Sequence, residues 1–291
     1  MTRYYTLAVT TKYWKPKTDY IREIVDAVDG KVADGDFVVV SEKALSIAQG
    51  NVVDESTFKP SFTAKLIATI WMPFAWGYFI GVACHFGQRL LGRIRAYPAE
   101  TGSRHKQVAL QYAGVSQALM FGSEGGIDGS NLPYSLVSLP LENTCDVAEA
   151  IRLQIQKRLG RKVTVVIVDT DKTYSFGNFH FTPRPTPMVG ISSHGGIVAY
   201  VVGRVLKLRK RPTPLAVAGR ELRAEEALTI ANVADRARGP GSGATVWDMA
   251  ARFKVAATGV TWTMLAQIKH KPIVIVRKAT QPQQASRLEN R

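Results

Sequence analysis

Two short segments hold acidic side chains at points where a metal ion can bind. Asp128 lies in a glycine-rich turn at residues 125–131, and Asp169 follows an apolar run at residues 163–168. Carboxylates on separate rigid points of a fold supply the oxygen ligands that a hard divalent cation prefers. The hydroxyl of Thr170 can add a third oxygen. Asp-Gly and Asp-Thr pairs are also ordinary turn chemistry, which is the interpretation that their spacing alone favours.

Another glycine-rich segment, residues 239–243, can offer backbone N–H groups to a phosphate. It lacks the Lys-Ser/Thr pair that completes a P-loop, so a plain loop is the preferred interpretation. The sequence contains neither a Gly-x-Ser-x-Gly nor a Gly-x-Gly-x-x-Gly motif. The motifs alone therefore leave a metal and phosphate site as an alternative to ordinary turns, and they identify no catalytic nucleophile.

The charge of the chain favours anionic partners. Lys and Arg number 38 against 23 Asp and Glu, which gives a formal net charge of +15. Such an excess attracts phosphorylated small molecules, nucleic acid or an anionic membrane face. Nucleic acid is not expected, because no helix-turn-helix, RNP-like strand or zinc module is evident. Two cysteines and an N-terminus without a signal-peptide pattern predict a cytoplasmic protein with free thiols.

Residues 66–84 form an uncharged segment that is rich in aromatic side chains. A membrane helix needs about 20 such residues, but Pro73 would break or kink it. Three interpretations stay open: a buried or dimer-interface helix, an interfacial membrane anchor, and a membrane span. The first is preferred, because a single span would split an otherwise soluble pattern.

The elements that must position the acidic residues follow one another without a βαβ rhythm. Predicted strands cover residues 4–9, 37–40, 163–168, 198–208 and 272–277. Predicted helices cover residues 18–28, 146–159, 221–238 and 247–267. This order predicts an α+β fold with a mixed, largely antiparallel sheet and packed helices. We expect a main nucleotide and metal domain over residues 1–220, a helical section with a final strand over 221–278, and a loose tail over 279–291.

Four segments occur in the order and approximate spacing of a known family. Residues 34–50 resemble the "DGDvlvv…vSKAEGr" segment of the coenzyme F-420 glutamate ligases, and residues 126–131 resemble their "G[IV]DaSN". Residues 159–170 resemble their "LG…vgViitDT", and residues 219–222 their "GrEL". The chain thus resembles the F-420-0:gamma-glutamyl ligase family over most of its length.

This resemblance implies an enzyme, an acid–amino-acid ligase of coenzyme F-420 biosynthesis. It implies a gamma-linked amide bond between L-glutamate and a phosphorylated deazaflavin precursor, formed through an acyl phosphate with GTP and Mg²⁺ or Mn²⁺. It also implies an intertwined homodimer. By the resemblance the metal ligands are Asp128, Asp169 and Thr170, and the nucleotide contacts are Thr11, Lys12, Tyr13, Trp14, Ser41, Glu42 and Asn131. No catalytic residue is identified.

The chain departs from the family pattern at positions that bear on the reaction. Ile47 stands where the family has a nucleotide-binding lysine, for which Lys43 can substitute. The family's late nucleotide loop with its metal ligand corresponds either to residues 239–243 or to the segment with Gln267, which would then bind the metal. These departures leave open a paralogous ligase with another carboxylate acceptor. The apolar segment at residues 66–84 and the net charge of +15 leave open a non-catalytic, membrane-associated binding protein.

Overall fold

The computed structural model describes residues 3–122, 124–193, 195–243 and 245–279. In these ranges the chain contains a six-stranded sheet and a two-stranded one. From residue 280 on, the predicted tail over residues 279–291 lies outside the described residues. The strands are β1 (Tyr4–Thr11), β2 (Phe37–Ser41), β3 (Val52–Asp54), β4 (Leu136–Ser138), β5 (Thr164–Phe176), β6 (Phe179–Phe181), β7 (Arg209–Ala218) and β8 (His270–Lys278).

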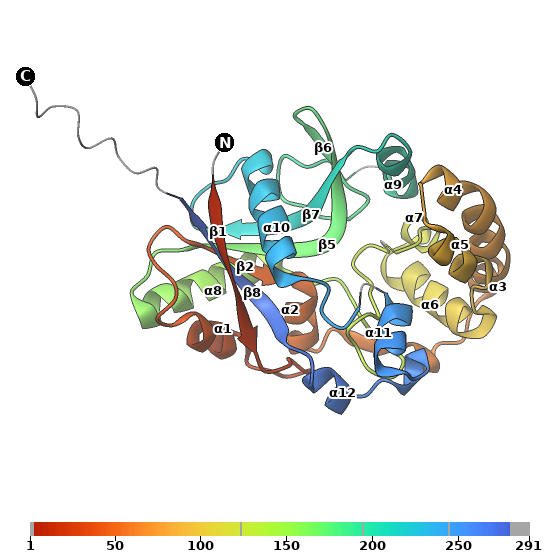
Figure 1. The fold of residues 1–291 in the computed structure, drawn as a ribbon, viewed down its shortest axis with the longest axis horizontal. Coiled ribbons are helices and arrows are strands. Elements are labelled where there is room, and N and C mark those ends of the chain that lie inside the picture. The colour runs from red at the N-terminus through yellow and green to blue at the C-terminus, as the bar shows by residue number, and fades with distance from the viewer. Residues whose placement is uncertain (1–2, 123, 194, 244, 280–291) are drawn as a thin grey trace, which may run out of the picture.

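The helices lie on both faces of the large sheet and in a separate group at one end of it (Figure 1). They are α1 (Tyr20–Val28), α2 (Glu42–Gln49), α3 (Phe62–Leu66), α4 (Gly81–Ala83), α5 (Gln88–Arg95), α6 (Ala99–Tyr112), α7 (Val115–Ala118), α8 (Thr144–Leu159), α9 (Gly196–Val205), α10 (Ala224–Arg238), α11 (Val246–Phe253) and α12 (Trp262–Ala266). A π-helical stretch, Ile67–Ile80, joins α3 to α4, and short 3₁₀ turns occur at Glu55–Thr57 and Ala257–Gly259.

The large sheet is mixed and largely antiparallel, which confirms the predicted α+β fold class. Its strand order is β1-β8-β2-β5-β6, and β7 also pairs with β5. β2 and β5 run parallel, whereas the other neighbours are antiparallel. β8 lies between β1 and β2. The final strand, from the section at residues 221–278, is therefore a central part of the sheet formed by residues 1–220.

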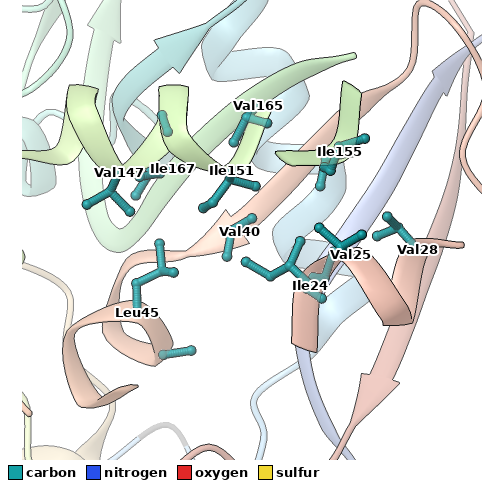
Figure 2. Close-up of a cluster of buried hydrophobic side chains, with 14 of the residues drawn as sticks. Ile24, Val25, Val28, Val40, Leu45, Val147, Ile151, Ile155, Val165 and Ile167 are labelled. Atoms are coloured by element: carbon teal, nitrogen blue, oxygen red, sulfur yellow. The ribbon is translucent and has the colours of Figure 1, made fainter. Parts of the chain in front are cut away.

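The apolar run of β2 is buried because helices cover both faces of the sheet. Val38 and Val40 belong to one buried cluster, and Phe37 and Val39 to another, in which Ile230 of α10 takes part. Successive side chains of a strand point to opposite faces, so a strand covered on both sides is apolar at every position. The first cluster contains Ile24, Val25 and Val28 of α1, and Val147, Ile151 and Ile155 of α8 (Figure 2).

β5 is longer than predicted, and Asp169 lies inside it rather than after its end. The apolar run stops near Val168, but polar residues continue the strand as far as Phe176 by pairing with β7. The register of that pairing shifts between Asp169 and Lys172, where Asp169 lies beside Thr213 and Lys172 beside Pro212. This β-bulge re-aims the side chains at the point where the strand leaves the core.

The strand predicted over residues 198–208 is wrong, since most of this segment is the helix α9. Ala199, Tyr200 and Gly203 form its buried face, and their three- and four-residue spacing is helical. An added Cβ at Gly203 would lie 2.2 Å from the ring of Tyr174, so only glycine allows this close approach. Packing against Tyr174 decides the local structure here despite the β-branched residues of the segment.

The apolar segment at residues 66–84 is helical, and its helix is the one in the described residues that is long and apolar enough to cross a membrane. A third of its most apolar window is buried. Met72 and Trp76 pack in a cluster with Ile94 and Tyr200 of neighbouring helices. The opposite face is exposed along residues four apart: Phe62, Leu66, Ile70, Phe74 and Tyr78. One face therefore belongs to the core, which supports the predicted packed helix.

Candidate functional site

A cleft of about 1010 Å³ opens where β2 ends and β5 reaches its bulge. The parallel register of these strands places Ser41 beside Val168. The next residue along each segment, Glu42 at the start of α2 and Asp169 within β5, lines the same cleft. Ligand sites commonly lie outside the carboxyl ends of parallel strands, and this is such a position.

Arg184 ties the two carboxylates together. Its Nε donates to Asp169 Oδ2 at 2.6 Å, and one of its Nη atoms lies 3.2 Å from Glu42 Oε1. All three side chains are almost fully buried, with exposed fractions of 2–8%. Gly126 has a φ of +95°, and a Cβ there would lie 2.7 Å from the guanidinium. The glycine-rich turn therefore needs glycine at this point to admit Arg184.

The electrostatic environment of Glu42 differs from that of an ordinary carboxyl. Burial and the nearby Asp169 carboxylate raise the pKa of Glu42, while Arg184 and a hydrogen bond from the Leu141 backbone lower it. That backbone N–H lies 2.6 Å from Glu42 Oε1. A buried pair of carboxylates is tolerated when a cation lies between them, which is the position of Arg184.

Asp128 closes an Asx turn and also faces the cleft. Its Oδ1 accepts a hydrogen bond from the backbone N–H of Ser130 at 2.6 Å. Lys43 of α2 forms an ion pair with the same carboxylate and donates to Ser130 Oγ at 2.9 Å. Asp128 therefore forms the expected turn and also presents its carboxylate to the cleft. The lysine at position 43 reaches the site from one helical turn before Ile47, which also lines the cleft.

Asn131 connects the acidic turn to the loop at residues 239–243. Its Oδ1 accepts hydrogen bonds from the backbone N–H of Ser242 at 2.8 Å and from Ser242 Oγ at 2.5 Å. Its backbone oxygen accepts from the Tyr13 hydroxyl at 2.6 Å. A Cβ on Gly241 would lie 2.7 Å from Asn131 Oδ1, so this contact requires the glycine.

The predicted site residues fall into two groups. Those that line the cleft are Tyr13, Ser41, Glu42, Asp128, Asn131, Asp169 and Thr170. Thr11 and Lys12 instead contact His270, and Trp14 is 1% exposed within the core. Gln267 is exposed at the end of α12 and is not among the lining residues, whereas residues 239–241 are. Both candidate late segments therefore reach the cleft, the second one through residues 268–272, although Gln267 itself does not line it.

The donor chemistry of Asp128, Asp169 and Thr170 suits a hard divalent cation. In the part of the chain that the structure describes, no three His, Cys, Asp or Glu side chains gather closely enough to hold a metal by themselves. Lys43 and Arg184 already pair with the two carboxylates. A cation bound by Asp128 or Asp169 would therefore have to take further ligands from the threonine hydroxyl, water and phosphate oxygens.

A second charged cluster lines another part of the cleft. His105 contacts Glu55 and Glu124, and the fully buried Lys106 donates to Glu124 and, at 2.7 Å, to the backbone oxygen of Met120. Burial lowers the pKa of His105, but the two glutamates outweigh it and raise that pKa to about 10. Burial raises the pKa of Glu124, but Lys106 and His105 lower it to about 2.

Sequence analysis missed Arg184 and the cluster around His105. Arg184 lies in a proline-rich stretch, Pro183 to Pro187, that carries no motif, and its partners are 15 and 142 residues away. Two converging buried carboxylates call for a buried cation, but no motif indicates which residue provides it. His105 and Lys106 lie on α6 with an ordinary helical pattern.

Comparison with known proteins gives two kinds of match. The model of the F420-0:Gamma-glutamyl ligase family matches residues 8–185. An uncharacterized protein of Methanocaldococcus jannaschii is 34% identical over 282 residues, which are 92% of this chain and 94% of that protein. The coenzyme F420:L-glutamate ligase of Archaeoglobus fulgidus is 29% identical over 141 residues, which are 47% of this chain and 49% of that enzyme.

Proposed function

The chain belongs to the F420-0:gamma-glutamyl ligase family, and from this premise we propose that it is a GTP- and divalent-metal-dependent ligase. Membership supports a ligase role in coenzyme F420 biosynthesis. In the proposed reaction, L-glutamate is joined through an amide bond to a phosphorylated deazaflavin precursor. The observation that carries the proposal is the meeting of Asp128, Asp169 and the Asn131-bound loop in one cleft.

The proposed reaction has two steps. A carboxylate oxygen of one substrate attacks the γ-phosphorus of GTP, so that an acyl phosphate forms and GDP leaves. The amine of the other substrate then attacks the acyl carbon, an amide bond forms and phosphate leaves with the electron pair of the broken C–O bond. The amine loses a proton in this step. A divalent cation would offset the negative charge of the transferred phosphoryl group.

The side chains of this protein have positioning roles in that scheme. Tyr13, Asn131 and the loop at residues 239–243 form the wall on which the nucleotide is proposed to lie. Arg184 holds Asp169 in one orientation by a charge-assisted hydrogen bond. Lys43 forms an ion pair with Asp128. Its ammonium group is thus a positive charge close to the place where phosphates are expected. This role compensates for the apolar Ile47.

A paralogous ligase with a different carboxylate acceptor is the second candidate function. The observation that favours it is Ile47, which is 4% exposed and lines the cleft where the family has a lysine. An apolar wall at this point changes which acceptor or nucleotide group fits. The nucleotide, metal and amide chemistry of the two candidates are the same, so they differ in the acceptor alone.

The partners and location are also proposals. We propose a homodimer by analogy with the family, and a cytoplasmic enzyme that contacts a membrane surface through residues 66–84. The exposed face of this apolar helix supports the membrane contact. The same face also supports the third candidate, a non-catalytic, membrane-associated binding protein.

The test is a ligation assay with GTP, Mn²⁺, labelled L-glutamate and the deazaflavin precursor. We expect amide product and inorganic phosphate in equal amounts, with no phosphate when either substrate is left out. Product that forms only when a metabolite extract replaces the deazaflavin would assign the paralogous function. No GTP cleavage under any of these conditions would overturn both ligase proposals.

A further inference from the structure

Arg238, the last residue of α10, is partly exposed as a whole, but its guanidinium nitrogens are buried and lack a hydrogen-bond partner among the described residues. These nitrogens are Nε and both Nη atoms. Burial lowers the pKa of Arg238, and Asp235 opposes this only in part. Guanidinium groups that are taken out of water normally pair with a carboxylate or phosphate, since an unpaired buried charge is strongly unfavourable.

Arg238 is one of the residues that line the large cleft. The loop at residues 239–243 follows it directly, and this loop is held by Asn131 on one side and by Arg252, whose Nη1 donates to the Gly241 oxygen at 3.0 Å. Arg238 is therefore on the same wall as the proposed nucleotide contacts. Its position is fixed by the end of a 15-residue helix rather than by a free loop.

Nearby charged groups do not neutralise Arg238. The carboxylate of Asp235 lies 3.3 Å from Lys172 Nζ, so this acid already has a cationic partner. His270 is also near: burial lowers its pKa to about 4, a hydrogen bond with Lys12 opposes this, and Arg238 adds to the lowering. His270 is consequently neutral at pH 7. Lys269 and Lys271 line the cleft on either side of it and add positive charge.

We propose that Arg238 is the anchor of an oxyanion-binding subsite in this cleft, which takes a phosphate or carboxylate group of a substrate. The planar guanidinium binds two oxygens of such a group at once, and Lys172, Lys269 and Lys271 add longer-range attraction. Which substrate supplies the oxyanion rests on the proposed function: GTP phosphate, acceptor phosphate or glutamate carboxylate. The binding of an oxyanion by Arg238 does not itself depend on the proposed function.

The first experiment measures oxyanion binding without catalysis. Thermal unfolding is followed with and without inorganic pyrophosphate, against sodium chloride of equal ionic strength, for wild type, Arg238→Met, Arg238→Lys and Arg223→Met. Arg223 is exposed at the other end of α10 and serves as the matched control. We expect pyrophosphate to raise the unfolding temperature of wild type and Arg223→Met, to act weakly on Arg238→Lys, and to have no effect on Arg238→Met.

The stability of the ligand-free variants separates an oxyanion-binding role of Arg238 from a structural one. If Arg238 binds an oxyanion, Arg238→Met without ligand is expected to unfold at the same or a higher temperature than wild type, because the variant removes an unpaired buried charge. A clear loss of stability in ligand-free Arg238→Met, together with an unchanged pyrophosphate response, would overturn the proposal. The Arg238→Lys variant separates charge alone from the two-oxygen contact.

The second experiment identifies the source of the oxyanion. KM values for GTP, acceptor and glutamate are measured separately in the ligation assay. Arg238→Met is expected to raise one of them at least tenfold while kcat changes less, and Arg223→Met is expected to change none. If all three KM values stay at wild-type levels, the subsite is ruled out while the ligase stands. If ligation is absent but the pyrophosphate effect depends on Arg238, the subsite stands and the proposed ligase function falls.

Discussion

At the scale of single residues, Arg184 is the side chain on which the acidic part of the site depends. It lies between Asp169 and Glu42, and all three are buried. Replacing Arg184 by Met should lower the free energy of unfolding by about 3–5 kcal/mol, because two buried carboxylates lose their cation. Urea unfolding monitored by circular dichroism measures this change.

The control for Arg184 is an exposed arginine with a carboxylate partner. Arg22 lies 3.5 Å from Asp26, and both side chains are at least half exposed. Arg22→Met should therefore cost less than about 1 kcal/mol. If both variants lose the same free energy of unfolding, the buried ion pairs of Arg184 stabilise the protein no more than an exposed pair does, which would contradict the prediction.

The cluster around His105 predicts how stability depends on pH. The pKa of His105 is raised from 6.5 to about 10, so the protonated form is favoured by folding. Its stabilising contribution is complete below pH 6.5 and is lost as the pH rises towards 10. Glu124, lowered from 4.5 to about 2, contributes fully above pH 4.5 and loses its effect as the pH falls towards 2.

The measurement is the free energy of unfolding of wild type and His105→Gln at pH 6.5 and pH 9.5. Wild type is expected to be less stable at pH 9.5. The difference between the two pH values should be smaller in His105→Gln, since glutamine does not titrate. A variant with the same pH dependence as wild type would show that another group causes the effect.

At the scale of elements, glycine positions decide whether α9 fits against β5. Gly203→Ala should destabilise the protein by about 1–3 kcal/mol, because the new methyl group meets the ring of Tyr174. Gly92→Ala is the matched control: this glycine is also helical, but nothing lies within 4 Å of an added Cβ. It should stabilise by about 0.5–1 kcal/mol. Thermal unfolding of both variants tests the pair, and destabilisation of similar size in both would contradict the packing argument.

Local patterns in the sequence were sufficient for several of the elements. The spacing of Ile24, Val25 and Val28 marked α1, and the uniformly apolar run at residues 37–40 marked a strand covered on both faces. The segment at residues 198–208 misled because its valines favour a strand, whereas contacts with distant residues such as Tyr174 select a helix.

The candidate site was predictable only in part. The order of motifs pointed to Asp128, Asp169 and Asn131, which do line one cleft. Arg184 was not predictable, because its carboxylate partners lie far along the chain. Arg238 was not predictable, because its significance lies in the burial of its guanidinium nitrogens. The bulge in β5 also depends on pairing with β7 and leaves no mark in the apolar pattern.

At the scale of the whole molecule, two helices that contact each other both carry exposed apolar residues. One is the helix at Phe62–Ala83, and the other is α9, with Val198 and Val202 and, at its C-cap, Leu206. Trp76 and Tyr200 join these helices, with ring centroids 5.7 Å apart. Exposed basic residues lie in or close to these helices at Lys65, Arg89 and Lys207, so the surface suits an anionic lipid face.

Sedimentation with phosphatidylserine vesicles tests this surface. Ile70→Glu and Phe74→Glu should each reduce vesicle binding at least threefold, whereas Leu153→Glu should not. Leu153 is an equally exposed apolar residue, at 48%, on α8 away from these two helices. Wild-type binding in the Ile70→Glu and Phe74→Glu variants would rule out the membrane contact. A dimer that dissociates in these variants would assign the exposed apolar residues to a subunit interface.

The most direct test of the account as a whole is calorimetric titration of GTP with and without Mn²⁺. The proposed site predicts that wild type and the exposed control Asp29→Asn bind GTP at least tenfold more tightly with Mn²⁺. Asp128→Asn and Asp169→Asn should lose this dependence on Mn²⁺ while circular dichroism shows that they remain folded. Folded variants that keep the wild-type effect of Mn²⁺ would contradict the assignment of Asp128 and Asp169 to a metal and nucleotide site.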